Sequence, residues 1–156
     1  MSRKKISKKR FPQVNPIYNN NLVSLLLSKI LKSGKKTLAQ RILVESFEII
    51  KNRTQNNPIK ILEKAVRNTS PSVEVKSKHF SNSVIQIPVN VTGFRATNLA
   101  LRWIIKYAGN RNGRTITINL ANEIIDASNE IGNSVKKKQE VHKIAEANKA
   151  FTQYRS

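Results

Sequence analysis

The stretch Val73-Glu-Val-Lys-Ser-Lys-His-Phe-Ser-Asn-Ser-Val-Ile-Gln-Ile-Pro-Val-Asn-Val91 decides the fold, because its apolar residues recur at every second position. The alternation covers 73–75 and 85–91, and the polar, turn-forming segment Lys76–Ser83 lies between them. Period-two patterning on both sides of a turn predicts one long β-hairpin at about 72–91 with a basic tip. An isolated hairpin is marginally stable in water, so one face must pack on helices or the tip must bind a partner.

Helical patterning precedes the hairpin. From about Asn20 apolar residues recur three or four positions apart, and we expect Gly34 to end this first helix as its C′ glycine. A second helix is predicted over about Lys36–Arg53. The third has a strong start signal, Asn57 as N-cap with Pro58 at the first helical position, and it should stop before the next proline, at position 71.

Three further helices are expected after the hairpin. The first runs from about Thr92 to Gly109, and the second spans about Thr115–Asn129, although its Thr-Ile-Thr-Ile opening could equally start a strand. Asn133 or Ser134 should cap a last helix that continues to about Phe151. The sequence therefore predicts a mainly α fold: a single domain of about six helices over 20–156, with the hairpin arm between helices three and four, preceded by a basic N-terminal arm over 1–19.

Charge is distributed unevenly along the chain. The formal net charge is +20 over 156 residues, yet the first acidic residue is Glu45, and a second acid-free stretch runs from Val75 to Asn122. Such self-repulsion calls for a polyanionic partner, most commonly nucleic acid. Because the second stretch begins in the hairpin and ends after the fourth helix, we expect it to form one contiguous face that binds this polyanion.

Several classes of function are disfavoured. The chain has no cysteine, which excludes disulfides, thiol catalysis and zinc fingers, and no apolar run approaches the roughly 18 residues of a membrane span. Its two histidines, His79 and His142, have no metal-ligand spacing, and Gly34-Lys-Lys-Thr37 lacks the first glycine of a phosphate-binding loop. The acids on helices are better explained by solvated faces or protein contacts than by acid–base pairs. We expect no enzymatic activity, no cofactor, no metal, no small-molecule substrate and no membrane partner.

Basic residues of several kinds are candidates for RNA binding. Lysines offer point charges to phosphate, and arginine forks can grip it bidentately. Lysines at the start of the last helix would face the positive end of its dipole, where an external anion would relieve the repulsion. Any one of these side chains could equally be merely solvated. The candidates are Arg3, Lys4, Lys5, Lys8, Lys9, Arg10, Lys35, Lys36, Lys76, Lys78, Arg95, Arg102, Arg111, Arg114, Lys136, Lys137, Lys138 and Arg155.

Four aromatic residues lie near the basic positions, namely Phe11, Tyr18, Phe80 and Tyr154. They could stack on unpaired bases, or they could be core or covering residues. No recognition-helix or zinc-finger pattern is clear. Composition therefore favours RNA over DNA only modestly, and a DNA-binding architectural or regulatory protein remains the alternative.

The C-terminal residues carry a specific resemblance. Val135-Lys-Lys137, His142, Ala145-Glu-Ala-Asn-Lys-Ala-Phe151 and Tyr154-Arg155 resemble the end of the seventh protein of the small ribosomal subunit, bacterial and organellar type. The resemblance continues upstream, and there the sequence is most similar to plastid-encoded members of the family. The upstream matches are Asn15-Pro-Ile-Tyr18, Ile30-Leu-Lys-Ser-Gly-Lys-Lys36, Pro71-Ser-Val-Glu-Val-Lys76, Gln86-Ile-Pro-Val89 and Leu101-Arg-Trp103.

The resemblance implies six helices with an extended hairpin, and binding to the 3′ major domain of small-subunit ribosomal RNA, where the family helps nucleate assembly of the head. It also implies that the hairpin lies near the exit-site transfer RNA and the messenger RNA path, and that the last helix faces a neighbouring small-subunit protein. The expected location is a plastid ribosome, with the bacterial cytoplasm as the alternative. At the hairpin tip this chain departs from the family, because Lys78-His79 and Ser81-Asn82 replace the usual two arginines and glycine pair.

Overall fold

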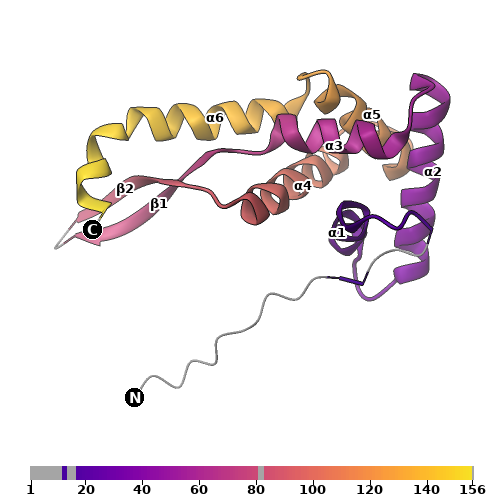
Figure 1. Cartoon of the computed structure of the whole chain (residues 1–156), viewed down its shortest axis with the longest axis horizontal. Helices are drawn as coiled ribbons and strands as arrows, with labels where there is room; N and C mark the ends of the chain where they lie inside the picture. Colours follow the sequence, from indigo (N-terminus) through magenta and orange to yellow (C-terminus); the bar gives the residue numbers. More distant parts are fainter. Residues whose placement is uncertain (1–11, 14–16, 81–82, 156) are drawn as a thin grey trace, which may run out of the picture.

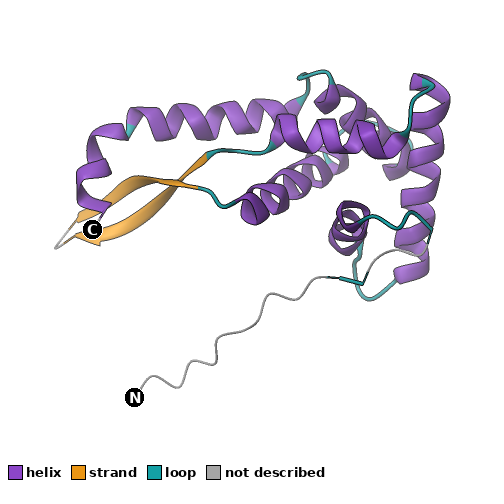
Figure 2. Cartoon of the chain, viewed as in Figure 1, coloured by secondary structure: helices purple, strands orange, loops and turns teal. Residues whose placement is uncertain are grey.

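The β-hairpin forms at the residues for which the period-two pattern predicts it. The computed structural model describes residues 12–13, 17–80 and 83–155. Strands β1 (Val73–Phe80) and β2 (Ser83–Asn90) pair antiparallel, with Val73 opposite Asn90 and Phe80 opposite Ser83. Figure 2 shows this two-stranded ribbon extending from the helices. A hairpin between the third and fourth helices is thereby confirmed.

Six α-helices are formed by the described residues, in the order that the sequence predicts, followed by a short 3₁₀ segment. Figure 1 shows α3, α4 and α6 running along the long axis of the molecule, with α2 standing across one end. The elements are α1 (Asn21–Ile30), α2 (Lys36–Thr54), α3 (Pro58–Thr69), α4 (Gly93–Gly109), α5 (Ile116–Ser128), α6 (Asn133–Ala147) and η1 (Lys149–Arg155).

Local capping chemistry explains where α1 and α3 begin. The Asn20 side chain accepts a hydrogen bond from the Leu22 N–H at 2.7 Å, and the Asn57 side chain accepts one from the Ile59 N–H at 2.9 Å. Both bonds satisfy an amide that has no partner within the helix. The predicted cap of α3 by Asn57 is therefore confirmed, with Pro58 as the first helical residue.

Two boundaries differ from the prediction. The first helix ends at Ile30, because the backbone of Leu31 leaves helical geometry (φ −57°, ψ 122°), so Gly34 is not its C′ residue. Gly34 lies instead in the loop before α2 with a φ of 72°, a conformation that glycine adopts without strain. The last helix ends at Ala147 rather than near Phe151, and the chain continues as η1.

The alternative strand at the start of the fifth helix is wrong. Thr115 has extended backbone geometry and is the N-cap of α5, and its hydroxyl accepts a hydrogen bond from the Ile118 N–H at 3.4 Å. Apolar and polar residues alternate there because Thr117 and Asn119 are themselves buried. Buried polar residues therefore produce a false strand pattern within a helix.

One core unites the helices. Its side chains come from α1 to α5, with Val135 from α6, and Phe47, Leu101 and Ile124 are almost fully enclosed. Trp103 is only half-buried, and it lines a hollow with side chains of α6 and β1 at the junction of the core with the hairpin. None of the helices in the described part of the chain is both long and apolar enough to cross a membrane.

The hairpin is stabilised by the C-terminal elements. α6 contacts β1, and η1 contacts β2. Figure 1 shows the C-terminal segment bending from α6 down to the strands. At the root of the hairpin the Ser72 N–H donates a hydrogen bond to Nε2 of His142 at 3.2 Å. The sequence left open whether packing on helices or binding of a partner at the tip stabilises the hairpin. The structure shows packing on helices.

Candidate nucleic-acid interface

Three cationic side chains form a stripe along α4. Arg95, Arg102 and Lys106 are exposed, and they are separated by seven and four residues. At 3.6 residues per turn these separations place all three on one side of the helix, about 10 Å and about 6 Å apart along its axis. The stripe offers successive positive charges along a straight line, which suits a chain of phosphates.

The hairpin continues this stripe. Lys76 and Lys78 lie on the same face of β1 as Glu74, because successive side chains of a strand alternate between its two faces. Their cross-strand partners on β2 are Ile87 and Ile85. One face of the hairpin thus carries exposed lysines from one strand beside the partly buried Ile85 and the buried Ile87 from the other.

Glu74 joins the hairpin to the start of α4. Its carboxylate accepts a hydrogen bond from Nε of Arg95 at 2.8 Å and forms ion pairs with Nη2 of Arg95 at 2.7 Å and with Nζ of Lys76 at 3.9 Å. The hydrogen bond to Glu74, together with its charge, raises the pKa of Arg95. We call Lys76, Lys78, Arg95, Arg102 and Lys106 together the cationic face.

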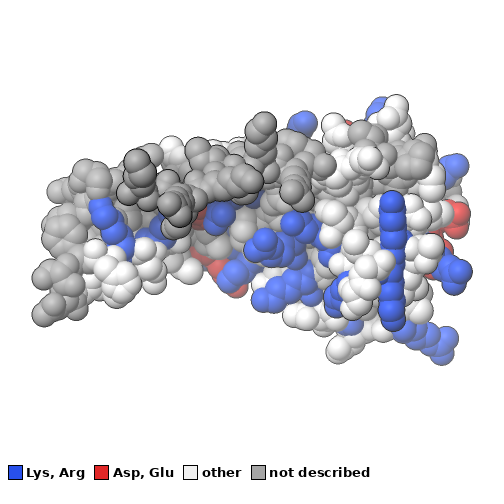
Figure 3. All heavy atoms as spheres, turned by 90° about the horizontal axis from the view of Figure 1, so that it is seen from below, with Lys and Arg blue, Asp and Glu red and all other residues white. Residues whose placement is uncertain are grey.

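Figure 3 views the molecule from below and shows blue side chains from the hairpin across the region of α4, with a small red group between the two. The second acid-free stretch does not lie on this surface over its whole length. Its last part belongs to α5, where Thr117, Asn119, Leu120 and Ala121 are buried. The expectation of one face from Val75 to Asn122 is therefore corrected to a face made by the hairpin and α4, because α5 belongs to the core.

Lys35 and Lys36 lie at the corner between α1 and α2, as predicted. Lys35 is the N-cap residue of α2 and Lys36 is its first helical residue, and both side chains are exposed. Arg114 is exposed in the α4–α5 loop. None of these three cations forms an ion pair with an acidic side chain among the described residues, so their charges face solvent.

Arg111 differs from the other candidates, because it lies in a partly buried ionic cluster. Its guanidinium donates to the Glu123 carboxylate at 2.7 Å and also contacts Asp126. Burial alone would lower the pKa of Arg111, but hydrogen bonds to Asp126 and Glu123 raise it. The Glu123 side chain is completely buried. The cluster joins the α4–α5 loop to α5.

Glu123 also caps the last helix. Its Oε1 accepts hydrogen bonds from the Ser134 N–H at 3.1 Å and the Ser134 hydroxyl at 2.6 Å. The N-cap residue of α6 is Gly132, with a φ of 102°, rather than Asn133 or Ser134. A carboxylate from α5 thus provides the anion that the positive end of the α6 dipole favours.

Two of the three candidate lysines of α6 are engaged within the protein, and the third, Lys136, is exposed. Lys136 is the last residue of the first turn, as predicted, whereas Lys137 and Lys138 lie in the second turn, since the helix starts at Asn133. Nζ of Lys137 lies 2.8 Å from the Glu140 carboxylate, and this hydrogen bond raises the pKa of Lys137. Nζ of Lys138 donates to the Asn68 carbonyl at 2.8 Å. Because Glu123 complements the helix terminus, the argument for an external anion there no longer holds.

The surroundings of His142 favour its neutral form. Burial, and then the charge of Lys138, lowers its pKa, and its Nε2 accepts the Ser72 N–H. Among the described residues, no group of three or more His, Cys, Asp or Glu side chains could hold a metal ion.

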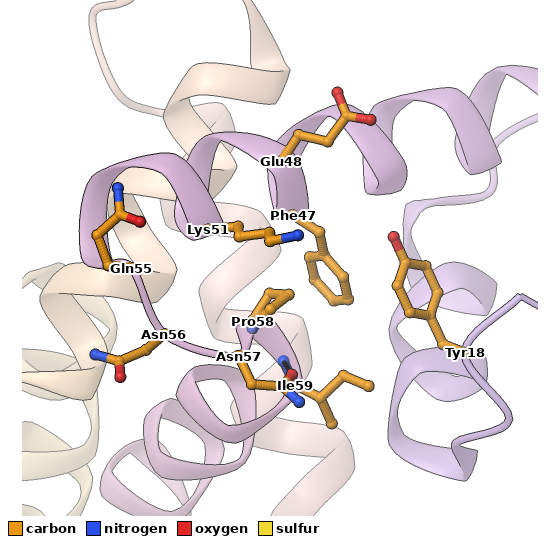
Figure 4. Close-up of a pocket in the computed structure, with 9 residues that line it drawn as sticks. All are labelled: Tyr18, Phe47, Glu48, Lys51, Gln55, Asn56, Asn57, Pro58 and Ile59. Carbon is orange, nitrogen blue, oxygen red and sulfur yellow. Dashed lines mark hydrogen bonds between the residues drawn. The ribbon is translucent and has the colours of Figure 1, made fainter.

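A hollow of about 560 Å³ opens beside Tyr18 and Phe47 (Figure 4). The two rings meet edge to face with their centres 5.2 Å apart, and burial, then Glu48, raises the pKa of Tyr18. Two of the amides at its edge are engaged locally, since Gln55 donates to the Asn52 carbonyl and Asn56 donates to that of Thr54. Tyr18 therefore acts as a covering residue of the core.

The remaining predicted positions lie outside the residues whose side chains are described. They are Arg3, Lys4, Lys5, Lys8, Lys9, Arg10 and Arg155, together with the aromatic residues Phe11, Phe80 and Tyr154. Lys106 was not among the predicted site residues, although its spacing of four from Arg102 on a predicted helix could have identified it. No sequence signal identified Glu123 as a buried cap, because its partners come from other elements.

A basic helical domain with a cationic face continued along a projecting hairpin belongs to the class of nucleic-acid-binding proteins. Comparison with known proteins specifies the class further. The model of the family "Ribosomal protein S7p/S5e" matches residues 2–149, and the chain belongs to this family. The resemblance that the C-terminal residues carry is thereby confirmed.

Proteins named uS7c and uS7 are similar in sequence to this protein over nearly its whole length. The small ribosomal subunit protein uS7c of Trieres chinensis is 59% identical over 144 residues, covering 92% of this chain and 91% of the relative. The small ribosomal subunit protein uS7 of Synechococcus elongatus is 45% identical, and that of a second Synechococcus strain is 46% identical, each over 155 residues and 99% of both chains. The match to uS7c agrees with the predicted plastid location.

Proposed function

We propose that this protein binds the 3′ major domain of small-subunit ribosomal RNA through the cationic face, and that it nucleates assembly of the head in a plastid-type ribosome. Lys35, Lys36 and Arg114 extend the contact beyond this face, and the N-terminal arm adds further phosphate contacts. The hairpin lies near the exit-site transfer RNA and the messenger RNA path. Neighbouring small-subunit proteins are further partners.

The observation that supports this proposal best is that cations of β1 and α4 lie on either side of Glu74, which pairs with Arg95 and Lys76. Glu74 ties Arg95 and the root of the hairpin together, so the cations of two elements far apart in the sequence act as one surface. Family membership supplies the kind of partner. Phosphate contacts dominate affinity and release counterions, so binding should fall steeply with salt.

The experiment measures affinity for a small-subunit RNA fragment as a function of salt. Arg102→Gln and Lys106→Gln should each weaken binding and reduce the slope of log affinity against log salt by about 1. Lys143→Gln is the matched control, because Lys143 is an exposed lysine of α6 outside the cationic face. Equal slopes for Lys106→Gln and Lys143→Gln would show that the cationic face is not the contact surface.

A DNA-binding architectural or regulatory protein is the second candidate, and the charge pattern by itself also supports it. Competition between the RNA fragment and duplex DNA at equal salt separates the two functions. A preference for the duplex would reject the ribosomal proposal. A footprint of the full chain on its small-subunit RNA tests the further proposal that contacts fall in the 3′ major domain.

A structural and non-enzymatic role is part of the same proposal. The family is that of a ribosomal protein. His142, a residue type that often acts as an acid or base in enzymes, already accepts a hydrogen bond from the backbone of Ser72. RNA incubated with the protein should therefore remain intact. Cleavage or modification that disappears in a His142→Gln variant would contradict this part of the proposal.

A further inference from the structure

An apolar groove of about 530 Å³ opens where four helices meet, and no residue of the cationic face lines it. Its walls come from the end of α1, the start of α2, the end of α4 and the start of α5. The aliphatic side chains that line it are Ile30, Leu38, Ile42, Ile105, Ile116 and Leu120. A cavity of this size has room for several side chains of a partner.

The groove leaves large aliphatic side chains in contact with water. Leu38 is 48% exposed and Ile116 is 41% exposed, and they belong to different helices that border the same groove. Leu31, next in sequence to the lining residue Ile30, is 38% exposed. Single exposed aliphatic residues are common, but several gathered around one groove are typical of an interaction site.

Charge at the groove selects among possible occupants. Lys32 and Lys35 are part of its lining, and none of the residues that line it, all within the described part of the chain, is acidic. An apolar ligand with carboxylates at its edge would bury its apolar side chains in the groove and pair with these lysines. The same lysines disfavour the chain's own arm, which has six basic residues and no acid by Arg10. A second copy of a chain with a net charge of +20 is disfavoured for the same reason.

RNA is a poorer occupant of the groove than a protein segment. No aromatic ring lines it, so an unpaired base would find no stacking partner there. Apart from the two lysines, Ser33 is the only lining side chain able to form a hydrogen bond. The polar edge of a base would therefore lose its hydrogen bonds to water without replacing them.

We propose that this groove binds an acidic amphipathic segment of another protein, with two or more aliphatic or aromatic side chains inserted between α2 and α5 and carboxylates placed at Lys32 and Lys35. The groove would then be a protein-binding site separate from the RNA-binding cationic face. No residue of the cationic face lines the groove, and Lys35 is the one cation that both proposals use. Binding of the segment and binding of RNA by the cationic face can therefore be tested separately.

The first test uses a synthetic amphipathic helix with Leu and Phe at positions i, i+3, i+4 and i+7 and Glu at the others. The full-length protein should bind this probe, and Leu38→Glu should weaken binding by tenfold or more through lost apolar contact and like-charge repulsion. Asn52→Glu is the matched control, since it makes the same charge change at an exposed position further along α2. Equal affinities of the two variants, or no binding of the probe by the unaltered protein, would overturn the proposal.

A second test places the groove in the assembled particle. Because the chain has no cysteine, Leu38→Cys introduces a single thiol for a photo-crosslinker, with Asn52→Cys as the control. The expected result is a crosslink from position 38, absent from position 52, to a protein segment that combines acidic and apolar residues. A crosslink to RNA or to this chain's own arm, or no crosslink at all, would contradict the assignment. Affinity for the RNA fragment, measured on the same variants, reports separately on the proposed RNA-binding function.

Discussion

Replacing Arg111 should destabilise the fold, because it leaves the fully buried Glu123 carboxylate without its cationic partner. Breaking a buried ion pair costs about 3–5 kcal/mol, and we expect the lower end of this range for Arg111→Met, because a quarter of the Arg111 side chain is exposed. A loss of about 3 kcal/mol corresponds to a fall of about 6–12 °C in the melting temperature of a chain of this size.

The assay is urea and thermal unfolding followed by circular dichroism, at a high salt concentration that screens the net charge. Arg114→Met is the matched control, since it removes the same charge from an exposed position of the same loop. Exposed substitutions of this kind usually change the free energy of unfolding by no more than about 0.5 kcal/mol. The double variant Arg111→Met with Glu123→Gln should lose less stability than the sum of the two single changes.

Two outcomes would refute the reasoning. Equal stability of Arg111→Met and Arg114→Met would mean that the buried carboxylate needs no cation. Strict additivity in the double variant would mean that Arg111 and Glu123 act independently. If Arg111→Met leaves stability unchanged and reduces the salt slope of RNA binding by about 1, Arg111 binds phosphate as the sequence predicted.

Three further predictions concern other elements. The pKa of His142 is lowered in the folded protein, so its contribution to stability is complete above pH 6.5 and is lost as the pH falls toward the folded-state value. The difference in melting temperature between the protein and His142→Gln should therefore be constant above pH 6.5 and shrink below it. A Cβ at Gly113 would lie 1.9 Å from Oδ1 of Asn119, so Gly113→Ala should cost about 1–3 kcal/mol in melting experiments, whereas Gly109→Ala, with open space around it, should not destabilise the fold. Deleting residues 1–14 should weaken RNA binding and leave the cooperative melt intact; loss of that melt would show that the arm belongs to the core.

Local signals predicted most of the elements. The N-terminus of α3 follows from Asn57 and Pro58, because a cap forms between neighbours in sequence. The hairpin follows from alternation over two short segments on either side of a turn. Gly34 misled the prediction, since a glycine that tolerates positive φ can lie anywhere in a loop, and the helix ends at Ile30, four residues before this glycine.

The candidate site was predictable only in part. The residues of the cationic face other than Lys106 were predicted individually from charge. The sequence did not predict which candidate cations have partners within the protein. Glu74, which pairs with Arg95, is 21 positions away, and the Asn68 carbonyl, which binds Lys138, is 70 positions away. Glu123 was expected on a solvated face or in a protein contact, and it is instead the completely buried cap of α6.

By itself the sequence determined the kind of partner, the order of the elements and the family, because composition, short-range periodicity and family motifs are properties of neighbouring residues. Tertiary structure alone decided which cations face solvent and which neutralise buried carboxylates. It also decided that aliphatic side chains from four helices surround one groove beside Lys32 and Lys35. The physical reason is that ion pairing and burial depend on distance in space, which packing of the core sets between residues far apart in the chain.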